Sequence, residues 1–203
     1  ASWASVYRSH AAYDDGQLPL VALHSAVSRP AAGEPALMSW ERANVIFHEF
    51  GHTLHMLMNR ATYRSLGTLA VPWDFIEVPS LLNERWLLDR DLLKRFLSHY
   101  KTGESMPDTL ISALFASRQQ DRVFSLGYPY LATAIVDLRL HLQADGRAID
   151  TVTMEREILE DIGLPPSLDL VLYASHASHT FSKQYAAGLY TYLWSDSYAA
   201  DAA

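Results

Sequence analysis

The sequence lacks cysteine altogether. A chain without thiols cannot form a disulfide framework, and any metal ion that it holds must be bound by nitrogen and oxygen atoms. The sequence also lacks any apolar run of the roughly 20 residues that a membrane-spanning helix needs. Mean hydropathy is accordingly close to zero, at -0.03. We therefore expect neither a disulfide-stapled module nor a membrane protein, and we expect a cytoplasmic location.

Positive charge is also scarce. The chain carries 16 Lys and Arg against 23 Asp and Glu, a formal net charge of -7. A basic face for phosphate groups is not indicated, so nucleic acid is not an expected partner. The first residues lack the basic and apolar blocks of a secretory signal, and both ends read as cut from a longer chain. With 203 residues, 49% of them hydrophobic, the sequence predicts one globular domain over 1–203.

Apolar periodicity predicts a mostly α fold with a small β element near the N-terminus. Residues 18–27 read as a strand and residues 30–35 as a loop. Ser39 is the expected N-cap of a helix that runs through the following apolar stretch, and Asp74 is the expected cap of a second helix ending near Asp89. Further helices are predicted near residues 90–101, 107–120, 128–144, 152–162 and 184–200.

One predicted helix contains the stretch VIFHEFGHTLH, from Val45 to His55. His48 and His52 are four residues apart, so a helix stacks them on one face within reach of one ion. Glu49 lies about 100° around the helix from His48 and can face the same ion without binding it. This His-Glu-x-x-His arrangement supplies two zinc ligands and a general base. A buried core histidine explains one such residue, but not two at this spacing with a carboxylate between them.

A catalytic zinc ion needs three protein ligands and one open position. Glu77, in the stretch WDFIEVPS, is the best candidate for the third ligand. Glu84 follows two helical turns later, and we expect its carboxylate to accept a hydrogen bond from a ligand histidine. A solvated helix carboxylate is the alternative for Glu84. His55 is interpreted as a core residue or as a neighbour of the ligands rather than a ligand.

Three stretches resemble the thimet oligopeptidase family, which includes bacterial oligopeptidase A and the peptidyl-dipeptidases. They are HEFGHTLH, DFIEVPS and, near the end, SHTFSKQYAAGLYTYLWS. The resemblance covers essentially the whole chain. It implies a zincin-like, helical metallopeptidase catalytic domain in which His48, His52 and Glu77 hold Zn²⁺ and Glu49 is the general base.

The resemblance also assigns His179, Tyr185 and Tyr192 to the scissile carbonyl. Tyr185 and Tyr192 are seven residues apart, which places both on one face of the predicted helix. A phenol there can donate a hydrogen bond to the developing oxyanion. The chain departs from the family where Lys183-Gln184 replaces two glycines.

The function that follows from the resemblance is zinc-dependent hydrolysis of short peptides, by either endopeptidase or dipeptidyl action. The family's large N-terminal part is absent from this chain, so apolar surfaces would be exposed and favour a homo-oligomer. One alternative is a zinc-bearing fragment that binds peptides but cleaves them weakly. Another is a chain that folds only in an oligomer, with a mainly structural metal.

Overall fold

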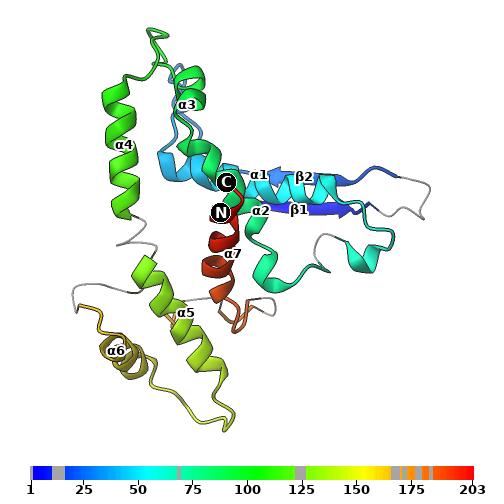
Figure 1. Ribbon diagram of the computed structural model, residues 1–203, viewed down its shortest axis with the longest axis vertical. Coiled ribbons are helices and arrows are strands. Elements are labelled where there is room, and N and C mark those ends of the chain that lie inside the picture. Colours follow the sequence, from blue (N-terminus) through cyan, green and yellow to red (C-terminus); the bar gives the residue numbers. More distant parts are fainter. Residues whose placement is uncertain are drawn as a thin grey trace. The chain divides into compact units, whose positions relative to one another are not determined.

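A computed structural model of the chain describes residues 2–10, 17–67, 70–121, 127–165, 170, 173–176, 180–182 and 185–203. This part is mostly helical, with one small two-stranded sheet near the N-terminus (Figure 1), which confirms the predicted fold class. The chain divides into two compact units, Ala1–Ile111 with Trp194–Ala203, and Ser112–Leu193. The single catalytic domain stays a prediction.

The first unit begins with an antiparallel pair of strands. β1 (Trp3–Arg8) pairs with β2 (Leu20–His24), with Trp3 opposite His24 and their rings stacked 4.6 Å apart. β2 is the predicted strand, although it is shorter than expected. β1 was not predicted, because alanine and serine within WASVYR weaken the β signal.

Helix α1 (Trp40–Met58) begins where the sequence indicated. The backbone N–H of Arg42 donates to the hydroxyl of the N-cap Ser39 at 3.4 Å. The helix packs against both strands and against α2 (Figure 1). It therefore carries the His-Glu-x-x-His stretch through the middle of the first unit.

The prediction of one continuous helix from Asp74 to Asp89 is wrong. The chain forms three short pieces instead, with η3 (Trp73–Phe75), α2 (Val78–Glu84) and η4 (Arg85–Leu88). Asp74 lies inside η3, whose N-cap is Pro72. Pro79 has no N–H and is tolerated only in a first helical turn, so a new helix must start beside it. As a result, Glu77 occupies the turn directly before α2.

Helices α1 and α2 cross closely at Gly51. A Cβ atom at this position would lie 2.5 Å from the carbonyl oxygen of Pro79 and 2.6 Å from the Cα of Ser80. Beside the crossing, the side-chain amide of Asn83 donates to the carbonyl of Phe47 at 2.7 Å. The missing side chain of Gly51 thus lets the first turn of α2 rest on α1.

The rest of the first unit includes η1 (Arg64–Leu66), α3 (Arg90–Phe96) and the last part of α7 (Tyr190–Asp201). α7 lies beside η3 and η4, because the Ser195 hydroxyl donates to the carbonyl of Asp74 in η3 at 2.8 Å. Arg85 and Asp196 form an ion pair at 3.0 Å. Helix α4 (Asp108–Asp121) contributes residues to both units.

The second unit has its core between α5 (Tyr128–His141) and α6 (Thr151–Asp161). Its buried apolar residues are Ala132, Val136, Ile158, Leu170 and Ala174. The helix predicted at 184–200 begins only at Tyr190, because residues 185–189 form a turn in which Ala187 takes a φ of 56°. That left-handed conformation cannot continue an α-helix.

The surface of the described residues is rich in large apolar side chains, including Leu18, Met58 and Leu142, which are 75%, 71% and 76% exposed. None of the described helices is long and apolar enough to cross a bilayer. Self-association through the apolar surface stays a prediction.

We expect Gly51→Ala to lower the free energy of unfolding by about 1–3 kcal/mol, because the added methyl group would have to displace α2 backbone atoms. Denaturant titration measures this change. Phe50→Ala, at an exposed neighbouring position of α1, is the control. At an open helical site the same Gly-to-Ala change would stabilise by about 1 kcal/mol. A stabilised Gly51→Ala protein would therefore contradict the close crossing.

Candidate metal centre

Two of the predicted ligands lie one turn apart on α1. The ring centroids of His48 and His52 are 4.9 Å apart, with an interplanar angle of 83°. Both side chains are mostly buried, with exposed fractions of 18% and 17%. The α-helix thus presents two imidazoles on one face, as the spacing predicts.

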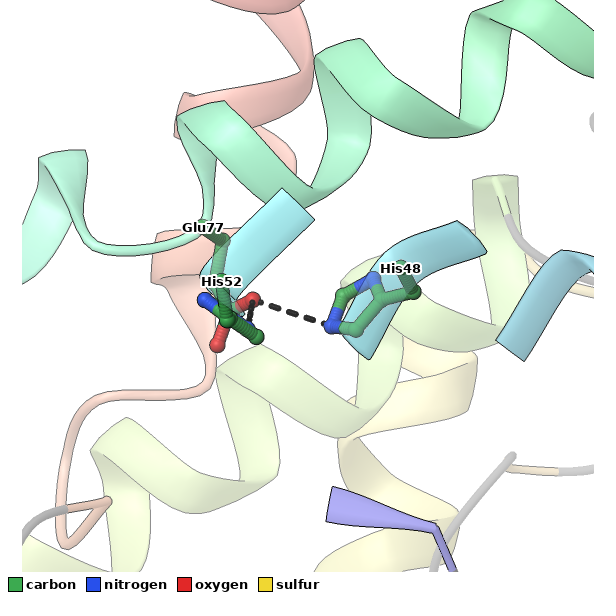
Figure 2. A group of neighbouring side chains, drawn as sticks. All are labelled: His48, His52 and Glu77. Atoms are coloured by element: carbon green, nitrogen blue, oxygen red, sulfur yellow. Dashed lines mark ion pairs between the residues drawn. The ribbon is translucent and has the colours of Figure 1, made fainter. Parts of the chain in front are cut away.

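Glu77 approaches this pair from the turn before α2 (Figure 2). Its Oε2 atom lies 3.2 Å from Nε2 of His48 and 3.1 Å from Nε2 of His52. The three ligand atoms all lie within 4.8 Å of one another. Donors about 2.1 Å from one tetrahedral ion are about 3.4 Å apart, so this nitrogen and oxygen set fits a zinc ion. Within the described residues the cluster has three members, which is typical of a catalytic rather than a structural site.

Further side chains orient these donors. Oε1 of Glu84 lies 2.7 Å from Nδ1 of His48, and the Asn44 amide donates to the other Glu84 oxygen at 2.7 Å. A proton on Nδ1 of His48, held by Glu84, leaves the Nε2 lone pair directed at the cluster. The Ser80 hydroxyl lies within hydrogen-bond distance of both the Oε2 atom and the carbonyl of Glu77, at 2.9 and 2.8 Å.

Sequence reasoning expected Glu84 at this place but missed Ser80 and Asn44. Ser80 follows Glu77 by three residues, and Asn44 precedes His48 by four. Residues three or four positions apart are neighbours on a helical turn, so these spacings could have indicated that Ser80 lies near Glu77 and Asn44 near His48.

The cluster is strongly coupled electrostatically. Burial on its own would lower the pKa of His48, but hydrogen bonds and charge from Glu77 and Glu84 raise it to about 10. Burial would likewise raise the pKa of Glu77, but the two imidazoles hold it far below its usual range. The cluster therefore favours a positive charge between the carboxylates of Glu77 and Glu84, and a divalent cation can supply that charge.

Glu49 lies beside the cluster without belonging to it. It is half-buried, and burial, with a smaller contribution from the charge of Glu77, raises the pKa of its carboxyl group. The two histidines and a hydrogen bond from the backbone of Ala4, in β1, act in the opposite direction. A carboxylate with a raised pKa is suited to accepting and returning a proton.

His55 lies outside the three-residue cluster found among the described residues. Its ring centroid is 6.5 Å from that of Phe75, edge to face. Burial, and then the neighbouring His52, lower its pKa. The interpretation of His55 as a packed side chain near the ligands fits this position.

The candidate residues of the C-terminal stretch belong to the second unit. His179, like Lys183 and Gln184, lies outside the described residues. The rings of Tyr185 and Tyr192 are stacked, with centroids 6.2 Å apart and planes 9° apart. The argument that placed them on one helix face is wrong, since Tyr185 precedes α7, but the turn brings the two rings together.

Comparison with known proteins shows similarity over the whole chain. The family model described as Peptidase family M3 matches residues 1–203. Dipeptidyl carboxypeptidase of Escherichia coli (strain K12) is 36% identical over 179 residues, covering 85% of this chain and 26% of that protein. Oligopeptidase A of the same organism is 35% identical over 196 residues, covering 93% and 28%. Probable cytosolic oligopeptidase A of Arabidopsis thaliana is 33% identical over 188 residues, covering 92% and 27%. The chain thus spans about a quarter of the length of these relatives.

We expect Glu84→Ala to weaken zinc binding about 10- to 100-fold, because His48 would lose the partner that orients its ring. His48→Ala should weaken binding further. Competition against a chromophoric chelator measures both affinities. His55→Ala is the matched control, and its affinity should equal that of the unmodified protein. Equal losses in His55→Ala and His48→Ala would exclude the assignment of the three-residue cluster.

Proposed function

The chain belongs to peptidase family M3, and from this premise we propose that it is the catalytic region of a zinc-dependent peptidase that cleaves short peptides. The observation that carries the proposal is the convergence of two imidazole nitrogens and one buried carboxylate oxygen beside Glu49. Three donors leave a place open for water and for a substrate carbonyl.

The residues that would hold the ion are His48, His52 and Glu77. The chemistry that zinc supplies when bound is polarisation of a carbonyl group and acidification of a water molecule. Glu84 and Ser80 keep the donor atoms in place through the hydrogen bonds described above. The side chains of α1 and of the α2 turn thereby preorganise the site before substrate arrives.

Glu49 is the proposed general base. It would remove a proton from the attacking water and deliver it to the nitrogen of the leaving amine. The half-buried position and the raised pKa of the Glu49 carboxyl group support this role. A carboxylate with a raised pKa accepts the proton of the attacking water more readily. The hydrogen bond from the Ala4 backbone would hold the carboxylate in place between these two transfers.

Tyr185, Tyr192 and His179 are the proposed donors to the carbonyl oxygen of the scissile bond, where negative charge develops. Such donors stabilise the transition state more than the ground state, so they act mainly on kcat. The stacked arrangement of the two phenol rings supports a joint role for the tyrosines.

The relatives reported above carry the names of two kinds of peptidase, a dipeptidyl carboxypeptidase and an oligopeptidase. We propose short peptides as substrates and leave both modes of cleavage open. A cytoplasmic location is part of the proposal and is supported by the absence of cysteine and by one relative described as cytosolic. The net charge of -7 argues against nucleic acid as a partner.

Glu49→Gln should retain bound zinc, and its rate of peptide hydrolysis should fall about 10²–10⁴-fold, since the amide cannot accept the proton of the water. An internally quenched peptide reports the rate, and metal analysis reports the zinc content. Chelator should abolish cleavage by the unmodified protein. Glu41→Gln, an exposed acid in the first turn of α1, is the control and should cleave at the normal rate.

Two outcomes would refute parts of this assignment. Normal turnover by Glu49→Gln would exclude Glu49 as the base. A zinc-loaded, unmodified protein that binds peptides but cleaves none would replace the peptidase proposal with the peptide-binding alternative.

Tyr192→Phe should lower kcat about 10²–10³-fold with little change in KM, because the lost hydroxyl would act on the transition state. Steady-state kinetics on the same peptide separate the two constants. Tyr198→Phe, at an exposed position of the same helix, is the matched control. An unchanged kcat in Tyr192→Phe would remove Tyr192 from the mechanism.

A further inference from the structure

The second unit contains a buried carboxylate that the proposed mechanism does not use. Asp137, on α5, is 1% exposed. Its Oδ1 atom accepts from the backbone N–H of Ala187 at 3.2 Å, and its Oδ2 atom accepts from that of Leu189 at 3.0 Å. Nδ1 of His141 lies 3.1 Å from Oδ1. The carboxylate thus binds two amides of a segment 50 and 52 residues away.

That segment is the turn of residues 185–189, directly before α7. Within the described residues, Ala187 is the only non-glycine residue with a positive φ, at 56°. A side chain with a Cβ disfavours this left-handed conformation, so the surroundings must hold it. Asp137 binds the N–H of Ala187 itself and the N–H two residues later. The carboxylate of Asp137 therefore binds the backbone at the strained residue, Ala187.

The turn joins the two candidate tyrosines. Tyr185 is its first residue, and Tyr192 lies in the first turn of α7. Within the turn, the N–H of Gly188 donates to the carbonyl of Tyr185 at 2.8 Å. α5 also contacts the aromatic pair directly, since the ring of Tyr130, two helical turns before Asp137, packs edge to face against Tyr192 at 5.7 Å. One helix therefore contacts both the backbone of the turn and a ring.

We propose that Asp137 is a positioning residue that fixes the 185–189 turn and thereby sets Tyr185 and Tyr192 side by side. Any catalytic consequence rests on the proposed function of the two tyrosines. A carboxylate suits this role because both of its oxygens accept, whereas an amide offers one acceptor and would turn its NH₂ group toward a backbone N–H.

The test compares Asp137→Asn with Glu155→Gln. Glu155 is the matched control, because it is a buried acid of the same unit and accepts from the Ala174 N–H at 2.6 Å, away from the turn. Asp137→Asn should lower kcat about 10²-fold with unchanged KM and zinc content, as expected when reacting groups are displaced. It should also speed amide hydrogen exchange at Ala187 and Leu189. Glu155→Gln should leave kcat and both exchange rates unchanged.

A rescue variant separates positioning from general stability. Adding Ala187→Gly to Asp137→Asn should restore part of the lost kcat, because glycine takes a positive φ without strain and needs the carboxylate less. An acid that contributed only stability would give no such recovery. Absence of any recovery would therefore count against the role of Asp137 at Ala187.

One measurement needs no variant. In the unmodified protein, amide exchange at Ala187 and Leu189 should be slow, and exchange as fast as that of an open turn would overturn the proposal even if Asp137→Asn fails to fold. If Tyr192→Phe lowers kcat while Asp137→Asn leaves kcat and exchange unchanged, the positioning role alone fails. If Tyr192→Phe has no effect, the proposed function of the tyrosines fails, and the exchange rates still decide whether Asp137 holds the turn.

Discussion

The first unit depends on the approach of one buried carboxylate to two imidazoles. Glu77 is 1% exposed, and its Oε2 atom lies about equally far from the Nε2 atoms of His48 and His52. A buried carboxylate is costly unless it is paired and hydrogen-bonded, and the Ser80 hydroxyl donates to Oε2 of Glu77. The approach is possible only because Gly51 lets α2 start against α1. The close packing of α1 against α2 therefore also determines the geometry of the candidate centre.

The second unit also contains a buried carboxylate that is stabilised by its hydrogen-bond partners. This acid is Asp137, and it accepts hydrogen bonds from two backbone amides that lie 50 and 52 residues away. An imidazole, that of His141, is a third neighbour, one helical turn away on α5. In the first unit the carboxylate is part of the candidate centre, and in the second it fixes a turn that carries candidate groups. In both units, an unpaired buried charge would be too costly, so the contact selects one arrangement of the chain.

The sequence predicts the features that depend on local spacing. The helix over His48 and His52 and its Ser39 cap follow from helical periodicity and capping chemistry, and the structure has both. Features that depend on contacts between distant segments were not predictable in this way. β1 forms because β2 pairs with it. The contact of Asp137 with Ala187 spans 50 residues and leaves no periodic signal.

The two predicted helices that prove to be interrupted, 74–89 and 184–200, are the ones that carry Glu77 and Tyr185. There is a physical reason for this coincidence. A regular helix offers side chains only at fixed intervals along one face, so α1 can supply two donors but not a third from another direction. The third donor must come from a segment that turns toward the face, and a turn needs a residue that breaks the helical pattern. Pro79 does this for Glu77 in the first unit. In the second unit, the left-handed Ala187 interrupts the helical pattern, and the rings of Tyr185 and Tyr192 lie stacked. Sequence patterns that assume regular structure fail at such residues. Within each unit, these are also the positions where side chains that a regular helix would keep apart come together.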